Sequence, residues 1–304
     1  MAETISRVTL FVPGTPSALD AWNVGILDPC IEVEWVENDG TFGEAFSFGT
    51  VEPALVEMID AVPGALVLSS SLDLREGRSR IVAAVERLRD AGALAVRIEQ
   101  SKLGWDVARW LELFSAHAPN AWHRGAVLSL DGEASVQSCG MHAFSLPDVN
   151  VSLDVDRSEI RQLISSLNVY QLAEDPVILS GQTFTPEQGK PLRLLERWPD
   201  LEYPPDHACH NPYGVWRLGP PGGIARPLGE LVPTFVPPLR ALLTALEAKH
   251  GAPLTKAQVE TVRDQGACIA MKPRDVQALE RERGYADLDP ELVWEQWQAI
   301  QQQR

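Results

Sequence analysis

The sequence predicts an α+β protein: a mixed β-sheet with amphipathic helices packed on it, a Pro-rich irregular wrap and a small helical C-terminal unit. Three observations predict this class. Short strand-like runs alternate with helical patterns through the first half, and an Asp-Gly hairpin signal stands at Asp131–Gly132. Residues 199–238 contain ten prolines. Strand and helix alternation followed by a hairpin is typical of a sheet covered by helices.

The first two strands are expected over residues 8–12 and 31–36. The first ends at a Pro-Gly turn, and the second alternates between apolar and acidic residues from Ile31 to Trp35. Because successive side chains of a strand point to opposite faces, the second strand has one solvent-facing side. One face carries Ile31, Val33 and Trp35, and the other carries Glu32 and Glu34.

Helices are expected where apolar residues recur at helical spacing, over 52–61, 75–91, 105–114 and 158–172. Gly92 ends the second of these, because glycine tolerates the positive φ of a helix C-cap. Strands are expected between the helices, at 65–68 and 93–98, and around the hairpin, at 126–130 and 134–138. The helices would then cover the sheet that the strands form.

The Pro-rich segment 199–238 is expected to be extended and irregular, because proline neither donates to a strand ladder nor sits inside a helix. Its many aromatic residues favour an ordered wrap over a flexible linker. Residues 1–250 are therefore predicted to form the core domain, and 251–304 a small helical unit. That unit opens with a capping box, Thr255 to Gln258.

The net charge of −16 is unevenly distributed. Residues 1–60 contain eleven acidic residues and one basic residue, which gives −10 of the −16. A field of this sign repels nucleic acid and anionic membranes and attracts basic proteins. An acidic surface also keeps a protein soluble without binding anything, so both interpretations stay open.

The chain is expected to be cytoplasmic. Its N-terminus has no basic region followed by an apolar stretch, and no apolar run approaches the length that crosses a bilayer. Its four cysteines, Cys30, Cys139, Cys209 and Cys268, are widely and singly spaced, which suits a reducing compartment. No cofactor is predicted, and the sequence leaves the oligomeric state open.

Two short Cys/His groups are the only candidates for chemistry. His207, Cys209 and His210 have side chains that bind zinc or copper, but no second ligand pair stands nearby in the sequence. Cys139 and His142 could join them, or act as a thiol nucleophile and its base. Polar residues packed in a Pro-rich loop and a small buried thiol are the competing interpretations.

Residues 65–184 resemble the uncharacterised bacterial family called domain of unknown function 4261. The resemblance lies in Leu66–Ser69, Ala91–Val96, Ser138–Asp148, Asn168–Tyr170 and Ser180–Thr183. No catalytic residue comes with this family, so the resemblance implies no active site. In general character the chain is similar to cytosolic immunity proteins of bacterial toxin systems, which are acidic and carry no catalytic motif.

The first functional hypothesis is an immunity-type or regulatory protein, not an enzyme, that binds a basic toxin or secreted effector. Its contact residues would be Trp22, Glu32, Glu34, Trp35, Glu37, Asp39 and Glu44. The second is an enzyme or a metal or small-ligand binder with a site near the two Cys/His groups. The third is a scaffold subunit that assembles through the C-terminal helices around Trp294 and Trp297.

Overall fold

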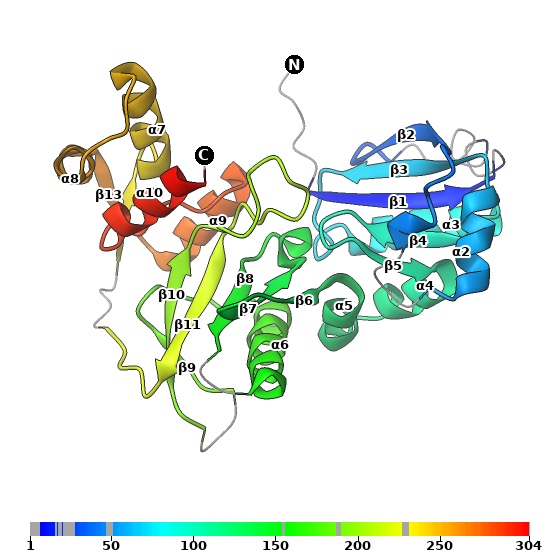
Figure 1. The fold of residues 1–304 in the computed structure, drawn as a ribbon, viewed down its shortest axis with the longest axis horizontal. Helices are drawn as coiled ribbons and strands as arrows, with labels where there is room; N and C mark the ends of the chain where they lie inside the picture. The colour runs from blue at the N-terminus through cyan, green and yellow to red at the C-terminus, as the bar shows by residue number, and fades with distance from the viewer. Residues whose placement is uncertain are drawn as a thin grey trace. The chain divides into compact units, whose positions relative to one another are not determined.

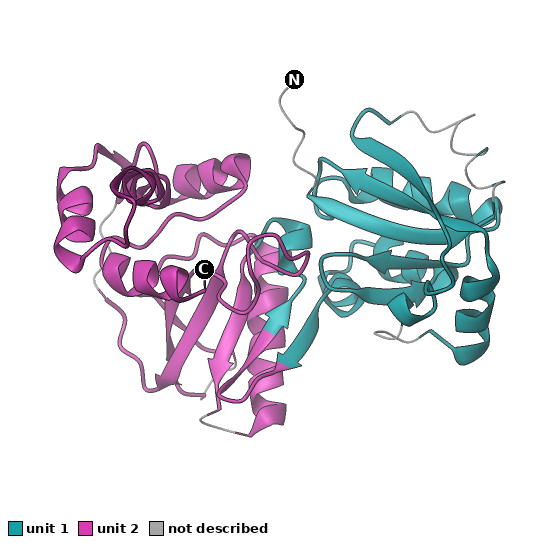
Figure 2. Cartoon of the chain, turned by 45° about the horizontal axis from the view of Figure 1, so that its top comes forward, with its two compact units in different colours: residues 1–130, 138–146 teal, residues 131–137, 147–304 magenta. Residues whose placement is uncertain are grey.

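The computed structural model describes residues 7–15, 17, 20, 28–46, 51–153, 156–186, 190–226 and 231–303. Its contacts divide the chain into two compact units, which Figure 2 distinguishes by colour. Unit 1 comprises residues 1–130 and 138–146, and unit 2 comprises residues 131–137 and 147–304. The sequence predicts a boundary near residue 250, whereas the division by contacts falls between residues 130 and 147.

Unit 1 contains an antiparallel five-stranded sheet in the order β2-β3-β1-β4-β5 (Figure 1). Its strands are β1 (Val8–Gly14), β2 (Ile31–Glu37), β3 (Gly64–Ser70), β4 (Ala95–Ile98) and β5 (Leu103–Asp106). Its helices are η1 (Glu44–Phe46), α2 (Pro53–Ala61), α3 (Arg78–Asp90), α4 (Val107–Ser115), α5 (Pro119–Ala126) and η2 (Met141–Phe144). The strand β2 is therefore an edge strand.

Each face of this sheet has its own apolar layer. Phe11 of β1 packs with Phe42, Phe46 and Ile59, so that η1 and α2 lie on this side. The alternate residues of β1, such as Leu10, are also buried and point to the opposite side. There α4 contacts β4, β5 and α3. Burial on both faces explains why β1 and β3 are apolar along almost their whole length.

Unit 2 is built on a mixed sheet in the order β6-β7-β8-β11-β10-β9. Its strands are β6 (Leu128–Asp131), β7 (Ser135–Cys139), β8 (Asp148–Ser152), β9 (Thr183–Phe184), β10 (Arg193–Trp198) and β11 (Val215–Pro221). The central strands β8 and β11 are parallel, and β7, β10 and β9 join them antiparallel. Strands β6 and β7 are also where the chain passes from one unit to the other.

The helix α6 (Arg157–Glu174) covers one face of this sheet (Figure 1). It begins at Asp156, whose carboxylate accepts a hydrogen bond from the Ser158 amide at 2.8 Å. A hydrogen bond from the Ser158 hydroxyl, together with the one from its amide, lowers the pKa of Asp156. The apolar residues that join helix and sheet are Val136, Val149, Val151, Ile160, Leu163, Ile164, Leu167, Leu195, Trp216 and Leu218.

The C-terminal part of unit 2 has a third, two-stranded sheet and four helices. The strands are β12 (Val232–Phe235) and β13 (Cys268–Met271), and the helices are α7 (Leu239–His250), α8 (Lys256–Gln265), α9 (Pro273–Arg283) and α10 (Val293–Gln302). The capping box of Thr255 and Gln258 is present. Phe235 and α7 share one apolar cluster with α8 and α10, so this packing begins before residue 251.

The α+β class is confirmed, with three corrections to the predicted elements. The expected single sheet is three sheets. The Pro-rich segment is not irregular throughout, because β11 crosses it as a central strand and its prolines, Pro220 and Pro221, stand at the strand end. The helix expected from residue 105 begins at Val107, because Leu103–Asp106 is a strand and Asp106 caps the helix. No helix among the described residues is both long and apolar enough for a bilayer.

Candidate functional site

The acidic residues predicted to bind a partner lie on β2 and the segment that follows it in unit 1. Glu32 and Glu34 are exposed and alternate with Ile31, which is buried. Val36, two residues further along the same face, packs in the cluster of Phe11 and α2. By strand alternation Glu32 and Glu34 therefore project from the α2 side of the sheet, beyond the part that the apolar cluster covers.

Four of these carboxylates have no cationic partner in the described part of the chain. Glu32, Glu34, Glu37 and Glu44 are exposed, and none forms an ion pair with a described residue. Their negative charge is therefore not neutralised locally. Unpaired surface charges act at the range of the Debye length, about 8 Å at physiological salt.

Asp39 differs from these four because it stabilises a turn. Its Oδ1 accepts hydrogen bonds from the Thr41 hydroxyl at 2.7 Å and from the Thr41 amide at 3.0 Å. These bonds lower the pKa of Asp39. Its charge adds to the acidic surface, but its first role is to fix the turn after β2.

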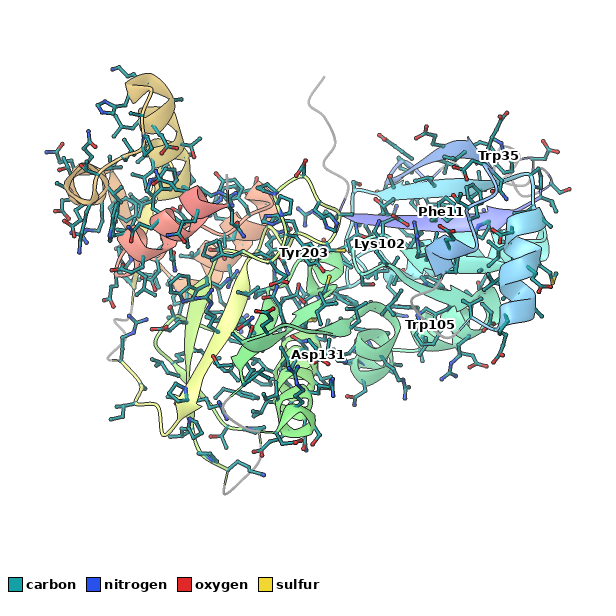
Figure 3. The ribbon with its side chains drawn as sticks, in the orientation of Figure 1. Phe11, Trp35, Lys102, Trp105, Asp131 and Tyr203 are labelled. Atoms are coloured by element: carbon teal, nitrogen blue, oxygen red, sulfur yellow. The ribbon has the colours of Figure 1, made fainter. Side chains whose placement is uncertain are left out.

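Of the two predicted aromatic contacts, only Trp35 lies in the described part of the chain, and it faces away from this surface. Trp35, labelled in Figure 3, is on the opposite face of β2 from Glu32 and Glu34. Its ring lies against Gly64, where an added Cβ would stand 2.3 Å from Cζ2. Trp35 is therefore a packing residue of the sheet edge, and Trp22 lies outside the described residues.

A residue that the sequence analysis missed supplies an apolar group on the acidic side. Met58 of α2 is 54% exposed, whereas Ile59 beside it is buried against the sheet. It is flanked in sequence by Glu57 and lies two residues before Asp60, both of them exposed. A methionine side chain is flexible and polarisable, so Met58 beside charged residues is suited to contact with a protein partner. The exposed side of the helix pattern was the signal that could have indicated it.

Asp28, just before β2, is paired. Its carboxylate accepts from the Cys30 amide at 2.9 Å and from Arg80 of α3 at 3.0 Å. The Cys30 bond contributes most to a lowered pKa of Asp28, and Arg80 adds to it. Asp28 therefore ties the start of the acidic segment to α3.

We expect the variant Asp28→Asn to lose stability at neutral pH by no more than about 1 kcal/mol, the usual worth of an exposed pair. Because the folded pKa lies below the unfolded one, this stabilisation is present above the unfolded pKa and is lost as pH falls through the folded pKa. Urea unfolding of both proteins at pH 7 and at about pH 3 checks this. A gap between them that stays constant with pH would contradict the expected linkage.

The first Cys/His group belongs to unit 1 and is buried. Cys139 ends β7, and its thiol donates to the carbonyl oxygen of Gln100, with an S–O distance of 3.4 Å. His142 lies in η2 and is 7% exposed. Both side chains therefore lie in the interior of unit 1.

The second Cys/His group belongs to unit 2 and forms a turn. The His207 Nδ1 accepts from the Cys209 amide at 3.1 Å, and its ring stacks on Tyr203 with centroids 4.6 Å apart; Tyr203 is labelled in Figure 3. The His210 Nδ1 contacts the Tyr203 carbonyl oxygen at 3.0 Å. Both rings thus make local turn contacts. Among the described residues no group of three His, Cys, Asp or Glu side chains is arranged to hold a metal ion.

The structure also reveals a cleft on the sheet of unit 2, on the face opposite α6. It has a volume of about 290 Å³. Its lining comes from β7, β8, β11 and the start of the Pro-rich segment: Ala134, Ser135, Gln137, Asn150, Ser152, Pro199, Leu201, Glu202, Val215, Arg217 and Leu218. Neither Cys/His group lines it.

A row of polar side chains crosses this face. Strand pairing places Gln137, Asn150, Arg217 and Glu196 side by side on β7, β8, β11 and β10. The Asn150 amide donates to Gln137 at 3.1 Å, and the Gln137 amide donates to Asp200 at 3.2 Å. Hydrogen bonds therefore fix Gln137 and Asn150 within this row.

Arg217 is the cation of this row. Its guanidinium lies over the Trp198 ring, 4.0 Å from the centroid, which is a cation–π contact. Burial lowers the pKa of Arg217, and Glu196 partly offsets this effect. Arginine nevertheless stays charged at neutral pH.

The structure thus defines an α+β protein of two units, with an acidic surface on one unit and a polar cleft on the other. Comparison of the chain with protein-family models, with curated proteins and with solved structures gave no match. The resemblance over residues 65–184 accordingly stays a prediction, and function is argued from the two surfaces alone.

Proposed function

We propose that the protein binds a basic protein through the acidic surface of unit 1, in the manner of an immunity protein that neutralises a bacterial toxin or secreted effector. The observation that carries the proposal is the set of exposed carboxylates that form no ion pair with a described residue. They lie on β2 and in the segment after it: Glu32, Glu34, Glu37 and Glu44. Glu32 and Glu34 project from the α2 face of the edge strand β2, Glu37 ends the strand on the other face, and Glu44 follows in η1.

Unpaired carboxylates suit association better than stability. They repel one another in the free protein, and a cationic partner relieves that repulsion on binding. Opposite potentials raise association rates by orders of magnitude at low salt and make binding salt-sensitive. Met58 of α2 adds an exposed apolar side chain on the same side of the sheet as Glu32 and Glu34. A cytoplasmic location fits this role and is part of the proposal.

The alternative of an acidic surface that serves solubility alone makes a different prediction. A merely solubilising surface depends on net charge and not on position. Position is therefore what the experiment must vary. The scaffold alternative gains no support from Trp297, which is fully buried in the cluster of its own unit.

The test compares two triple charge reversals that change the net charge equally. The first is Glu32→Lys with Glu34→Lys and Glu37→Lys. The control is Glu133→Lys with Glu174→Lys and Glu282→Lys, three exposed glutamates of unit 2 without an ion pair to a described residue. Each protein is used to capture partners from the native host, with elution by a salt gradient.

We expect wild type and control to retain one basic protein that salt releases, and the first triple variant to lose it. With that protein purified, the association rate of the first variant should fall at least tenfold, because like charges then face each other. Co-expression of wild type should protect cells from the captured protein, and the first variant should not. Equal capture by both triple variants would refute the proposal.

A further inference from the structure

The cleft of unit 2 combines a fixed cation with unused hydrogen-bond donors, independently of the acidic surface in unit 1. Arg217 forms no hydrogen bond or ion pair with any described residue, although it lines the cleft and is partly buried. A guanidinium carries five N–H donors in a planar fork, and desolvating them without a partner is costly. Its orientation is set by the Trp198 ring beneath it.

The neighbouring polar groups point to the same ligand chemistry. The Ser135 hydroxyl accepts a hydrogen bond from the Asn150 amide at 3.0 Å, so its own proton is left to donate. Ser152 stands directly opposite Ser135 in the pairing of β7 with β8, and it also lines the cleft. Its hydroxyl forms no bond to a described side chain. Two nearby acceptors are occupied, Gln137 by Asn150 and Asp200 by Gln137. The Glu196 carboxylate interacts with Arg217 electrostatically, and the Arg217 N–H groups still have no hydrogen bond to a described residue.

We propose that this cleft binds the carboxylate or phosphate group of a small molecule, with Arg217 as the anion anchor and the Ser135 and Ser152 hydroxyls as further donors. The arginine fork matches the paired oxygens of either group. The volume of about 290 Å³ admits a small metabolite and excludes a folded protein. Glu202, exposed at the rim, would face a cationic or hydroxyl group on the same ligand.

The proposal is tested with two probes, inorganic phosphate and succinate, titrated into the full chain. Binding is followed by ¹H–¹⁵N spectra that include the arginine Nε–Hε signals. We expect one probe or both to shift the Arg217 signal in a saturable way, and the stronger probe identifies the oxyanion. In Arg217→Met the affinity should fall at least tenfold, because charge-assisted hydrogen bonds are lost.

Two further variants serve as a control and as a second test of the cleft. Arg274→Met removes an exposed arginine of α9 that has no ion pair to a described residue, and it should bind as wild type does. Ser152→Ala changes an exposed side chain that the fold does not need, and it should weaken binding even if Arg217→Met folds poorly. The proposal would be overturned if neither probe gave a saturable shift. It would also be overturned if Ser152→Ala and Arg217→Met both bound the probe with the affinity of wild type.

Discussion

Replacement of Gly140 by alanine should destabilise the protein by about 2–6 kcal/mol, because backbone strain and an overpacked contact each cost about 1–3 kcal/mol. Gly140 has φ +123°, which side-chain-bearing residues rarely adopt. A Cβ at this position would stand 2.1 Å from the carbonyl oxygen of Ala126. That oxygen belongs to the backbone, and Ala126 is itself fully buried, so the contact has no flexible group that could give way.

The control for Gly140 is a glycine with the same conformational demand and free space. Gly222 has φ +89°, and a Cβ there would meet nothing within 4 Å. Gly222→Ala should therefore cost only the backbone term, about 1–2 kcal/mol. Urea unfolding followed by fluorescence and circular dichroism measures both variants. An equal decrease in the free energy of unfolding of the two variants would show that the contact with Ala126 contributes nothing to the effect.

The second large effect is expected for Trp297→Ala, at about 3–5 kcal/mol. Trp297 is fully buried in α10, among the apolar side chains of α7 and α8. Removal of the indole leaves a cavity that the surrounding helices close only in part. Since β12 and β13 connect to the same cluster through Phe235, we expect the whole C-terminal packing to loosen.

Trp294, three residues earlier on the same helix, is the matched control. It is only partly buried and packs at the border of the cluster. Trp294→Ala should cost clearly less than Trp297→Ala, since less apolar surface returns to water on truncation. Unfolding by urea, with hydrogen exchange of the α10 amides, compares the two. A larger loss for Trp294 would contradict the assigned packing.

Local features of the fold were predictable because they depend on neighbouring residues. The alternation in β2 places Glu32 outside and Ile31 inside, as the sequence analysis expects. The capping box at Thr255 and the turn at Gly132, whose amide donates to the Ser135 carbonyl oxygen at 2.9 Å, follow from short motifs. Such signals span a few residues, so the physics that produces them is visible in a short window of sequence.

The features that the sequence did not predict depend on the pairing of strands that are far apart in the chain. Strand β11 lies beside β8, more than sixty residues earlier in the chain, and no local pattern indicates that partner. The cleft has the same origin, because Ser135, Asn150 and Arg217 meet only through this pairing. Individually they are ordinary polar residues of strands. The acidic residues were recognisable from composition, and the alternation of β2 already placed Trp35 on the face opposite Glu32 and Glu34; its contact with Gly64 depends on the distant pairing of β2 with β3.

The interleaving of the two units has a consequence for vectorial synthesis and for fragment design. Unit 1 recruits residues 138–146, while residues 131–137 just before them belong to unit 2. A fragment ending at residue 130 lacks the buried Met141 and Phe144 of unit 1, and one ending at residue 146 carries away the β7 residues that pair with β8. No single cut yields both halves intact. During synthesis on the ribosome, unit 1 is complete only once residues 138–146 have been made, after residues 131–137 of unit 2.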